Sequence, residues 1–177
     1  AERAGDVVVI SGNNRRKAEY ITRAVQAGMH VLADKPMAID AAGFDSLRKA
    51  FAAAARKGVL LYDIMTERHE ITTMLQKAFS RLPAVFGELS EGSEREPAVV
   101  KESVHYFSKL VSGAPIKRPA WFFDVAQQGE GLVDITTHLV DLVQWECFPA
   151  EMLDFDRDIR ILGAKRWPTA ISPAEFA

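Results

Sequence analysis

Residues 129–141 hold the side chains with the clearest capacity for chemistry in this chain. The segment reads G-E-G-L-V-D-I-T-T-H-L-V-D and places Asp134 four residues before His138. On a helix, that spacing brings a carboxylate beside an imidazole on one face, which suits general acid and base chemistry. About a hundred residues earlier, Lys35 follows a strand-like segment. A lysine, an aspartate and a histidine together can move a proton while a hydride leaves a carbinol carbon.

Each of these residues also has a structural interpretation. An aspartate in the first turn of a helix is a favoured partner of the helix dipole, and an aspartate four residues from a histidine can be an ordinary surface contact. A lysine before a proline at a strand end can be an exposed charge on an extended segment. The local patterns leave both interpretations open, so the elements that position Lys35, Asp134 and His138 decide between them.

Residues 6–65 repeat one unit. In it, an apolar run rich in Val, Ile and Leu is followed by a helix, and a glycine ends the helix. Apolar strands that alternate with helices indicate a parallel sheet covered on both faces, so the predicted fold class is α/β with a doubly wound sheet. The predicted strands are Val7–Ile10, His30–Ala33 and 59–64, and the helices that follow them are 15–27, 41–57 and 67–79.

The ends of these elements give further predictions. Asn13 or Asn14 is the expected N-cap of the first helix, and Asp40 is the expected N-cap of the second. Ligands of such sheets collect at the carboxyl ends of the strands. In the predicted sheet this edge is formed by residues 11–14, 34–37 and 63–68, and Lys35 lies there.

The sequence changes character after residue 82. A polar segment and an irregular region with prolines and aromatic residues follow, so we expect a domain boundary near this point. The second region contains one strong helix pattern, over residues 132–147. Its strand candidates are residues 84–89 and 158–162.

The composition excludes several classes of protein. The 177 residues are 48% hydrophobic and 26% charged, as in ordinary globular proteins. A net charge of -2 without a basic stripe argues against nucleic acid as a partner. The single cysteine, Cys147, and the scattered histidines give neither a disulfide nor a zinc-ligand spacing, so no metal site is expected. No apolar run approaches the roughly 18 residues that span a bilayer. The low cysteine content makes the cytoplasm the expected compartment.

Two segments resemble signatures of one enzyme family. Residues 28–36, G-M-H-V-L-A-D-K-P, resemble the G-x-H-V-x-x-E-K-P motif of the Gfo/Idh/MocA oxidoreductases, the family of glucose-fructose oxidoreductase and inositol dehydrogenase. Residues 129–141 resemble that family's G-G-x-x-x-D-x-x-x-H-x-x-D segment. The two motifs stand in the family's order, one at the edge of a β-α-β unit and one opening a helix in the next domain. The pair is therefore a more specific match than either motif alone.

The resemblance implies roles for individual residues. It makes Lys35 a catalytic group near nicotinamide and substrate, and it puts Asp134 and His138 at the substrate, with the histidine transferring the proton. The implied reaction is reversible hydride transfer between NAD or NADP and a hydroxyl of a sugar, sugar derivative or cyclitol. Cofactor contacts are expected from Ser11, Asn13, Asp34, Lys35 and Pro36.

Other side chains are candidates for contact with the substrate. Cations, a histidine and an aromatic ring can supply hydrogen bonds and a stacking face for a sugar. The alternative for each is an ordinary packing or surface role. These candidates are Arg68, Lys101, His105, Arg118 and Trp121.

The chain also departs from the family pattern. Asp34 replaces the usual glutamate, which retains the charge and shortens the side chain by one methylene. After the first strand, where the family often has T-P-N and a nearby histidine, the chain has residues 11–17, S-G-N-N-R-R-K. The cations Arg15, Arg16 and Lys17 oppose the helix dipole. They are either a solvated helix start or the partners of an anion such as a cofactor phosphate.

No G-x-G-x-x-G turn and no initiator methionine precede the first strand, so we expect a fragment. The prediction is the C-terminal half of a Rossmann-like dinucleotide-binding domain over 1–82, followed by part of an α+β substrate domain over 83–177. Family members are commonly dimers or tetramers, which is compatible with a homo-oligomer. Two alternatives stay open: a non-catalytic sugar-binding or regulatory protein on the same scaffold, and an NAD-dependent glycoside hydrolase of the same family.

Overall fold

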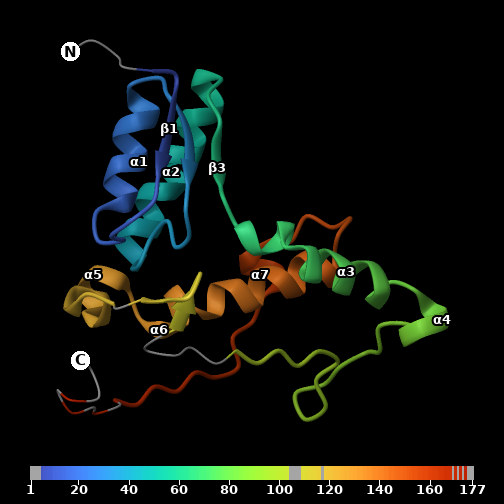
Figure 1. The fold of residues 1–177 in the computed structure, drawn as a ribbon. Coiled ribbons are helices and arrows are strands. Elements are labelled where there is room, and N and C mark those ends of the chain that lie inside the picture. The colour runs from blue at the N-terminus through green and yellow to red at the C-terminus, as the bar shows by residue number, and fades with distance from the viewer. Residues whose placement is uncertain are drawn as a thin grey trace.

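The computed structural model describes residues 5–103, 109–116, 118–168, 170, 172 and 174. A three-stranded parallel sheet with two long helices comes first, and a mostly helical region lies below its lower end in Figure 1. The strands are β1 (Val7–Ile10), β2 (His30–Ala33) and β3 (Leu61–Asp63), in the order β1-β2-β3. The predicted α/β fold class with a parallel sheet is confirmed, although the third strand is shorter than predicted.

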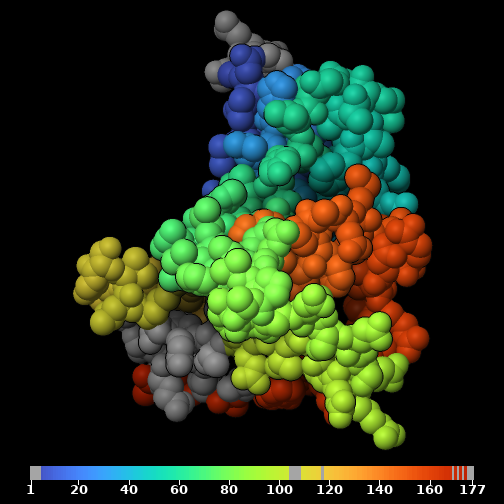
Figure 2. All heavy atoms as spheres, turned by 90° about the vertical axis from the view of Figure 1, so that its right-hand side faces the viewer, coloured from blue at the N-terminus to red at the C-terminus, as the bar shows by residue number. Residues whose placement is uncertain are grey.

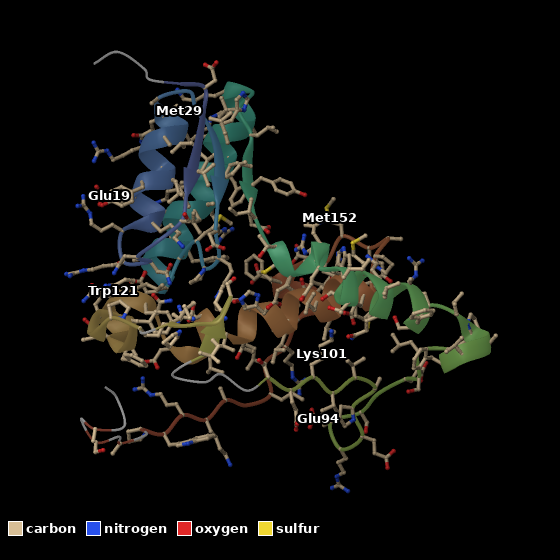
Figure 3. All side chains as sticks on the ribbon, viewed as in Figure 1. Glu19, Met29, Glu94, Lys101, Trp121 and Met152 are labelled. Carbon is tan, nitrogen blue, oxygen red and sulfur yellow. The ribbon has the colours of Figure 1, made fainter. Side chains whose placement is uncertain are left out.

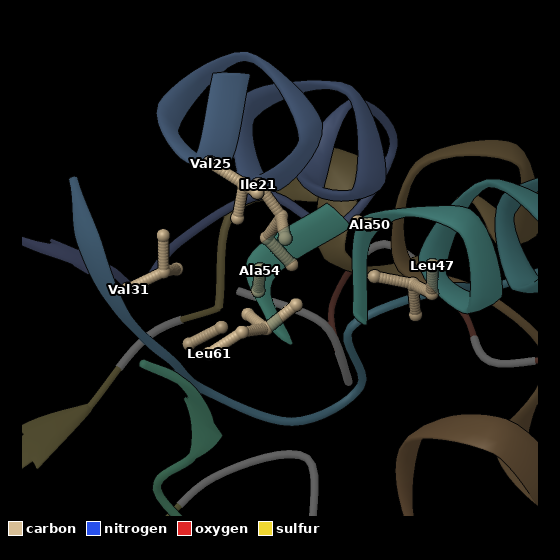
Figure 4. Close-up of a cluster of buried hydrophobic side chains, with 8 residues drawn as sticks. Ile21, Val25, Val31, Leu47, Ala50, Ala54 and Leu61 are labelled. Carbon is tan, nitrogen blue, oxygen red and sulfur yellow. The ribbon is translucent and has the colours of Figure 1, made fainter. Parts of the chain in front are cut away.

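Helices α1 (Lys17–Gln26) and α2 (Ala41–Lys57) pack on one face of this sheet. Eight side chains from α1, α2, β2 and β3 form the core between them, and Figure 4 shows most of this cluster. The expectation of cover on both faces is not met among the described residues, because consecutive crossovers in one direction put both helices on the same side. The other face exposes side chains of the strands, namely Val7, Val9 and Tyr62.

The boundaries of α2 agree with the sequence. Asp40 Oδ1 accepts a hydrogen bond of 2.7 Å from the Gly43 N–H, and Gly58 ends the helix with a φ of 66°. The predicted cap of the first helix is wrong, because α1 begins at Lys17 and the N-cap position is Arg16, without a side-chain cap bond.

The second region contains short helices and one hairpin around the long helix α7 (Thr136–Cys147). Helix α3 (Ile71–Ser80) runs beside α7, and Figure 2 shows their residues side by side below the sheet. No helix of the described residues is long and apolar enough to cross a membrane. The other elements are η1 (Thr66–His69), α4 (Pro83–Phe86), the antiparallel strands β4 (Lys109–Val111) and β5 (Ala114–Ile116), η2 (Ala120–Phe123), α5 (Val125–Gln128), α6 (Gly131–Asp134) and α8 (Phe155–Asp158).

Three element predictions after Met65 are wrong. Residues 84–89 are not a strand, because Pro83 starts the helical turn α4 and Gly87, with a φ of 74°, ends it. Residues 158–162 are not a strand either, and Asp154 instead caps α8. The single helix expected over 67–79 is interrupted at Glu70, whose backbone is extended.

Candidate active site

Lys35 extends from the carboxyl end of β2 to the end of α6. Its Nζ donates hydrogen bonds to the Oδ1 of Asp134 at 3.0 Å and to the backbone carbonyl of Asp134 at 2.6 Å. The two side chains are 20% and 10% exposed. Residues 99 positions apart in sequence therefore form an ion pair that is mostly shielded from water. The two segments that resemble the family motifs meet at this contact.

This contact accounts for a break in the helix predicted over 132–147, which divides into α6 and α7 at Ile135. In a continuous helix the Asp134 carbonyl would accept the N–H of His138. That N–H instead donates to the Ile135 carbonyl at 3.1 Å, and the Lys35 ammonium occupies the Asp134 carbonyl. Asp134 and His138 consequently do not share one regular helix face.

The carboxylate nearest to His138 comes from η1 and not from Asp134. Glu67 Oε2 lies 3.0 Å from the Nδ1 of His138, without the alignment of a hydrogen bond, and among the described residues this buried nitrogen has no hydrogen-bond partner. No sequence pattern singles out Glu67, although it lies in the strand-end segment 63–68 where ligands are expected.

Arg68 joins η1 to the middle of α7. Its Nε donates to the Oδ2 of Asp141 at 2.7 Å, and a second bond joins Nη2 to Oδ1. This bidentate hydrogen bonding to Asp141 holds the pKa of Arg68 above its ordinary value. The predicted substrate-binding guanidinium is thus engaged within the protein, where it fixes the position of Glu67 relative to His138.

Lys17 is buried, with 1% of its surface exposed, so neither interpretation of the three cations holds for it. Its Nζ donates to the Oδ1 of Asn14 at 2.7 Å, to the Asp34 carbonyl at 3.1 Å and to the Lys35 carbonyl at 3.5 Å. Burial is the largest influence on this amine and lowers its pKa. Only the spacing of three between Asn14 and Lys17 could have indicated the contact from sequence. The exposed Arg16 pairs with Glu19.

The expected cofactor residues surround the ends of β1 and β2. Ser11 is exposed, whereas the Asn13 amide donates to Gln127 at 3.1 Å. Asp34 Oδ1 accepts the backbone N–H of Lys35 at 2.9 Å, and Pro36 is buried.

Gly12 leaves space at the end of β1. It has a φ of 133°, which favours glycine, and an added Cβ would meet no atom within 4 Å. An open backbone at β1 and an ammonium at β2 fit the nicotinamide end of a dinucleotide, which such sheets bind at the carboxyl ends of their strands.

The other substrate candidates do not gather at the Lys35 contact. Lys101 pairs with Glu146 at 2.8 Å in a cavity of about 630 Å³ that Cys147 also lines. The Arg118 guanidinium lies 4.4 Å from the centre of the Phe122 ring, and Trp121 also packs against that ring. Figure 3 shows Trp121 near α5 and Lys101 below α7. The candidate His105 lies outside the described residues.

A larger cavity, of about 1050 Å³, borders α6 through Gly131 and Leu132. Phe123, Arg166 and Trp167 also line it, but Lys35 and Asp134 do not. The size of this cavity therefore does not locate the candidate site, which the side-chain chemistry at Lys35 indicates instead.

Family models match both regions of the chain. Residues 1–64 match the model described as "Oxidoreductase family, NAD-binding Rossmann fold", and residues 75–177 match the model described as "Putative oxidoreductase C terminal domain". The chain belongs to the Gfo/Idh/MocA oxidoreductases. The family assignment from the two motifs is confirmed, and with it the NAD-binding Rossmann class of the first region. A comparison with curated proteins gave no match.

Several solved structures resemble this chain. A Parabacteroides merdae protein, described as a putative oxidoreductase, is 57% identical with a TM-score of 0.90 over 98% of this chain and 39% of its own. The Thermus thermophilus WlbA (WbpB) dehydrogenase in complex with NAD and UDP-GlcNAcA is 19% identical (TM-score 0.51, 79% of this chain, 39% of its own). Biliverdin reductase from Synechocystis, in complex with biliverdin and NADP+, is also 19% identical (TM-score 0.54, 81% and 39%). The latter two show the fold alone, and this chain spans about two fifths of each protein's length.

Proposed function

We propose that the complete gene product is an NAD(P)-dependent oxidoreductase that transfers a hydride between nicotinamide and a hydroxyl of a sugar, sugar derivative or cyclitol. The observation that carries this proposal is the contact between Lys35 and Asp134, which joins the cofactor edge of the sheet to the end of α6. A protein of the same fold, the WlbA (WbpB) dehydrogenase, binds NAD and UDP-GlcNAcA, so the fold is compatible with a sugar-related substrate. Biliverdin reductase has the same fold with a different substrate, so the substrate class rests mainly on the side-chain chemistry.

The bound nicotinamide supplies the position that accepts or returns the hydride. The chain supplies charge stabilisation and proton transfer. The Lys35 ammonium, 20% exposed, can donate a hydrogen bond to the substrate oxygen as negative charge develops on it. Asp134 accepts from this ammonium with two oxygens and so restricts its position.

His138 is the group proposed to exchange the proton of the substrate hydroxyl. Its Nδ1 is buried beside Glu67, so Nε2 is the ring nitrogen available to the substrate. Because Arg68 and Asp141 tie η1 to α7, Glu67 keeps a defined position next to the imidazole. The Lys35 ammonium, held at the end of α6, and the His138 imidazole, on the first turn of α7, are thus proposed to have separate tasks.

The test is an assay of the complete gene product for reduced nicotinamide absorbance, with a panel of sugars, sugar nucleotides and cyclitols. Wild-type protein should turn over at least one class. The substitutions Lys35→Met and His138→Gln should each lower kcat by about 10²- to 10⁴-fold, the usual contribution of such groups. Lys57→Met is the matched control, because Lys57 also donates to a backbone carbonyl, that of Gln26, but at the opposite end of the sheet.

Two outcomes would contradict the proposal. Sugar binding without bound cofactor or turnover would indicate a non-catalytic binding protein. Cleavage of a glycoside with tightly held NAD and no net change in its redox state would indicate a hydrolase.

A further inference from the structure

Lys17 is a buried cation next to the candidate site. The proposed proton and hydride transfer does not require this cation. It opens α1, and its ammonium is enclosed by one side-chain oxygen and two backbone carbonyls. Burial of an ammonium costs free energy, which hydrogen bonds to neutral oxygens offset only in part. The lowered pKa of Lys17 reflects that cost. A methionine of similar length would avoid that cost but would leave the three oxygens without this donor, so the contacts of the ammonium, and not its volume, account for a lysine here.

The two carbonyls belong to Asp34 and Lys35, the segment that carries the catalytic ammonium. Lys17 therefore contacts the backbone from which Lys35 extends, and the Lys35 side chain then contacts Asp134. A continuous series of polar contacts runs from the first turn of α1 to the end of α6.

Asn14 connects the Lys17 ammonium to the segment that carries Asp134, the acidic partner of Lys35. Its Oδ1 accepts from Lys17, and its Nδ2 donates to the Gln128 carbonyl at 2.9 Å, in the segment just before α6. Asn14 is 3% exposed. The next residue, Gly129, approaches the segment after Lys35 so closely that an added Cβ would lie 2.9 Å from Ile39 Cγ2. The unit of Asn14 and Lys17 thus contacts both segments that carry the ion pair.

We propose that Lys17 is a positioning residue, which fixes the separation of Lys35 and Asp134 by holding the carbonyls of Asp34 and Lys35 and by orienting Asn14 toward Gln128. This inference rests on the proposed function, because the separation matters for turnover only if Lys35 takes part in it. Errors of about 1 Å in the position of a reacting group can cost about 100-fold in rate.

The experiment compares wild type, Lys17→Met and the control Lys57→Met in the complete gene product. The first readout needs no cofactor: reductive methylation of lysines, followed by peptide mass spectrometry, reports how accessible the Lys35 amine is. In Lys17→Met the labelling rate of Lys35 should rise about 10-fold, because its backbone support is lost. The second readout is steady-state kinetics, where kcat should fall by about 10- to 100-fold, the usual loss for a supporting residue, with a smaller change in KM. Lys57→Met should match wild type in both.

Unchanged labelling of Lys35 in folded Lys17→Met protein would overturn the proposal. If that variant does not fold, Asn14→Ala replaces it, because it removes the acceptor and the bond to Gln128 while leaving the ammonium in place. Labelling equal to wild type in Asn14→Ala would likewise overturn the proposal. Raised labelling in a protein that oxidises none of the substrates would support the positioning contact and reject the proposed reaction, so the two failures are distinguishable.

Discussion

The chain up to Met65 and the chain after it are held together by different interactions. Apart from Asn14 and Lys17, the buried side chains of the first region are apolar, whereas the buried side chains of the described residues after it are Asp134 and Glu146, both acidic. The first region therefore owes its arrangement to the burial of apolar surface, which depends on a local pattern. The second owes its arrangement to specific charged partners far away in sequence.

The charged partners of the second region form ion pairs along α6 and α7. Each of three acidic residues there pairs with a cation from another element: Asp134 with Lys35, Asp141 with Arg68, and Glu146 with Lys101. Because all six side chains are mostly buried, removing one partner leaves an uncompensated charge. The proposed catalytic pair is thus one of three contacts that dock this helical segment.

Removing a core side chain of the first region should have the largest effect on stability. Ile21 is 0% exposed, and Ile21→Ala should lower the free energy of unfolding by about 4 kcal/mol through lost burial and the cavity left behind. Urea unfolding of the complete gene product measures the loss, and hydrogen exchange locates it. Peptides from residues 5–65 should lose the most protection.

Leu132→Ala is the matched control in the second region, because Leu132 is 48% exposed. Its cost should be below about 1 kcal/mol. An equal loss for Leu132→Ala and Ile21→Ala would contradict the division between a region with an apolar core and a region held by ion pairs.

Breaking one ion pair should have the next largest effect. The Lys101 and Glu146 side chains are 16% and 7% exposed, so Lys101→Met leaves a buried carboxylate and should cost about 3 kcal/mol. The double variant Lys101→Met with Glu146→Leu removes both charges and should recover most of that loss in thermal unfolding. A double variant no more stable than Lys101→Met would contradict the expectation that the unpaired Glu146 carboxylate causes the loss.

The sequence predicts the first region well because burial of apolar surface depends on a local pattern. The strands Val7–Ile10 and His30–Ala33 and the helix Ala41–Lys57 follow local apolar periodicity, and Asp40 is a local cap. In the second region local patterns mislead: residues 84–89 include apolar side chains with strand propensity, such as Val85 and Phe86, but Pro83 favours a helical turn.

The candidate site divides in the same manner. The two family motifs predicted that Lys35 and Asp134 belong to one site, and the structure brings them into contact. The break at Ile135 and the approach of Glu67 to His138 depend on partners distant in sequence, so periodicity could not indicate them. Burial of Lys17 escaped prediction because a cation beside two arginines has the pattern of a solvated helix start.

The titration of Lys17 should change stability less than these substitutions. Burial lowers its folded pKa below the ordinary value of 10.5. Between the folded pKa and 10.5 the unfolded chain binds more protons, so stability should rise with pH in that interval. The free energy of unfolding of wild type minus that of Lys17→Met should therefore increase as pH approaches 10.5. A flat or falling difference would contradict a buried ammonium at this position.

Loss of the surface pair between Arg16 and Glu19 should have the smallest effect, although these residues adjoin Lys17. Their side chains are 55% and 46% exposed, and water and salt screen an exposed pair three residues apart on a helix. Arg16→Ala should therefore leave the thermal midpoint and the labelling of Lys35 at wild-type values, whereas Lys17→Met changes the labelling. A similar effect of both substitutions would mean that the charge of this helix start, and not the buried contacts of Lys17, supports the catalytic segment.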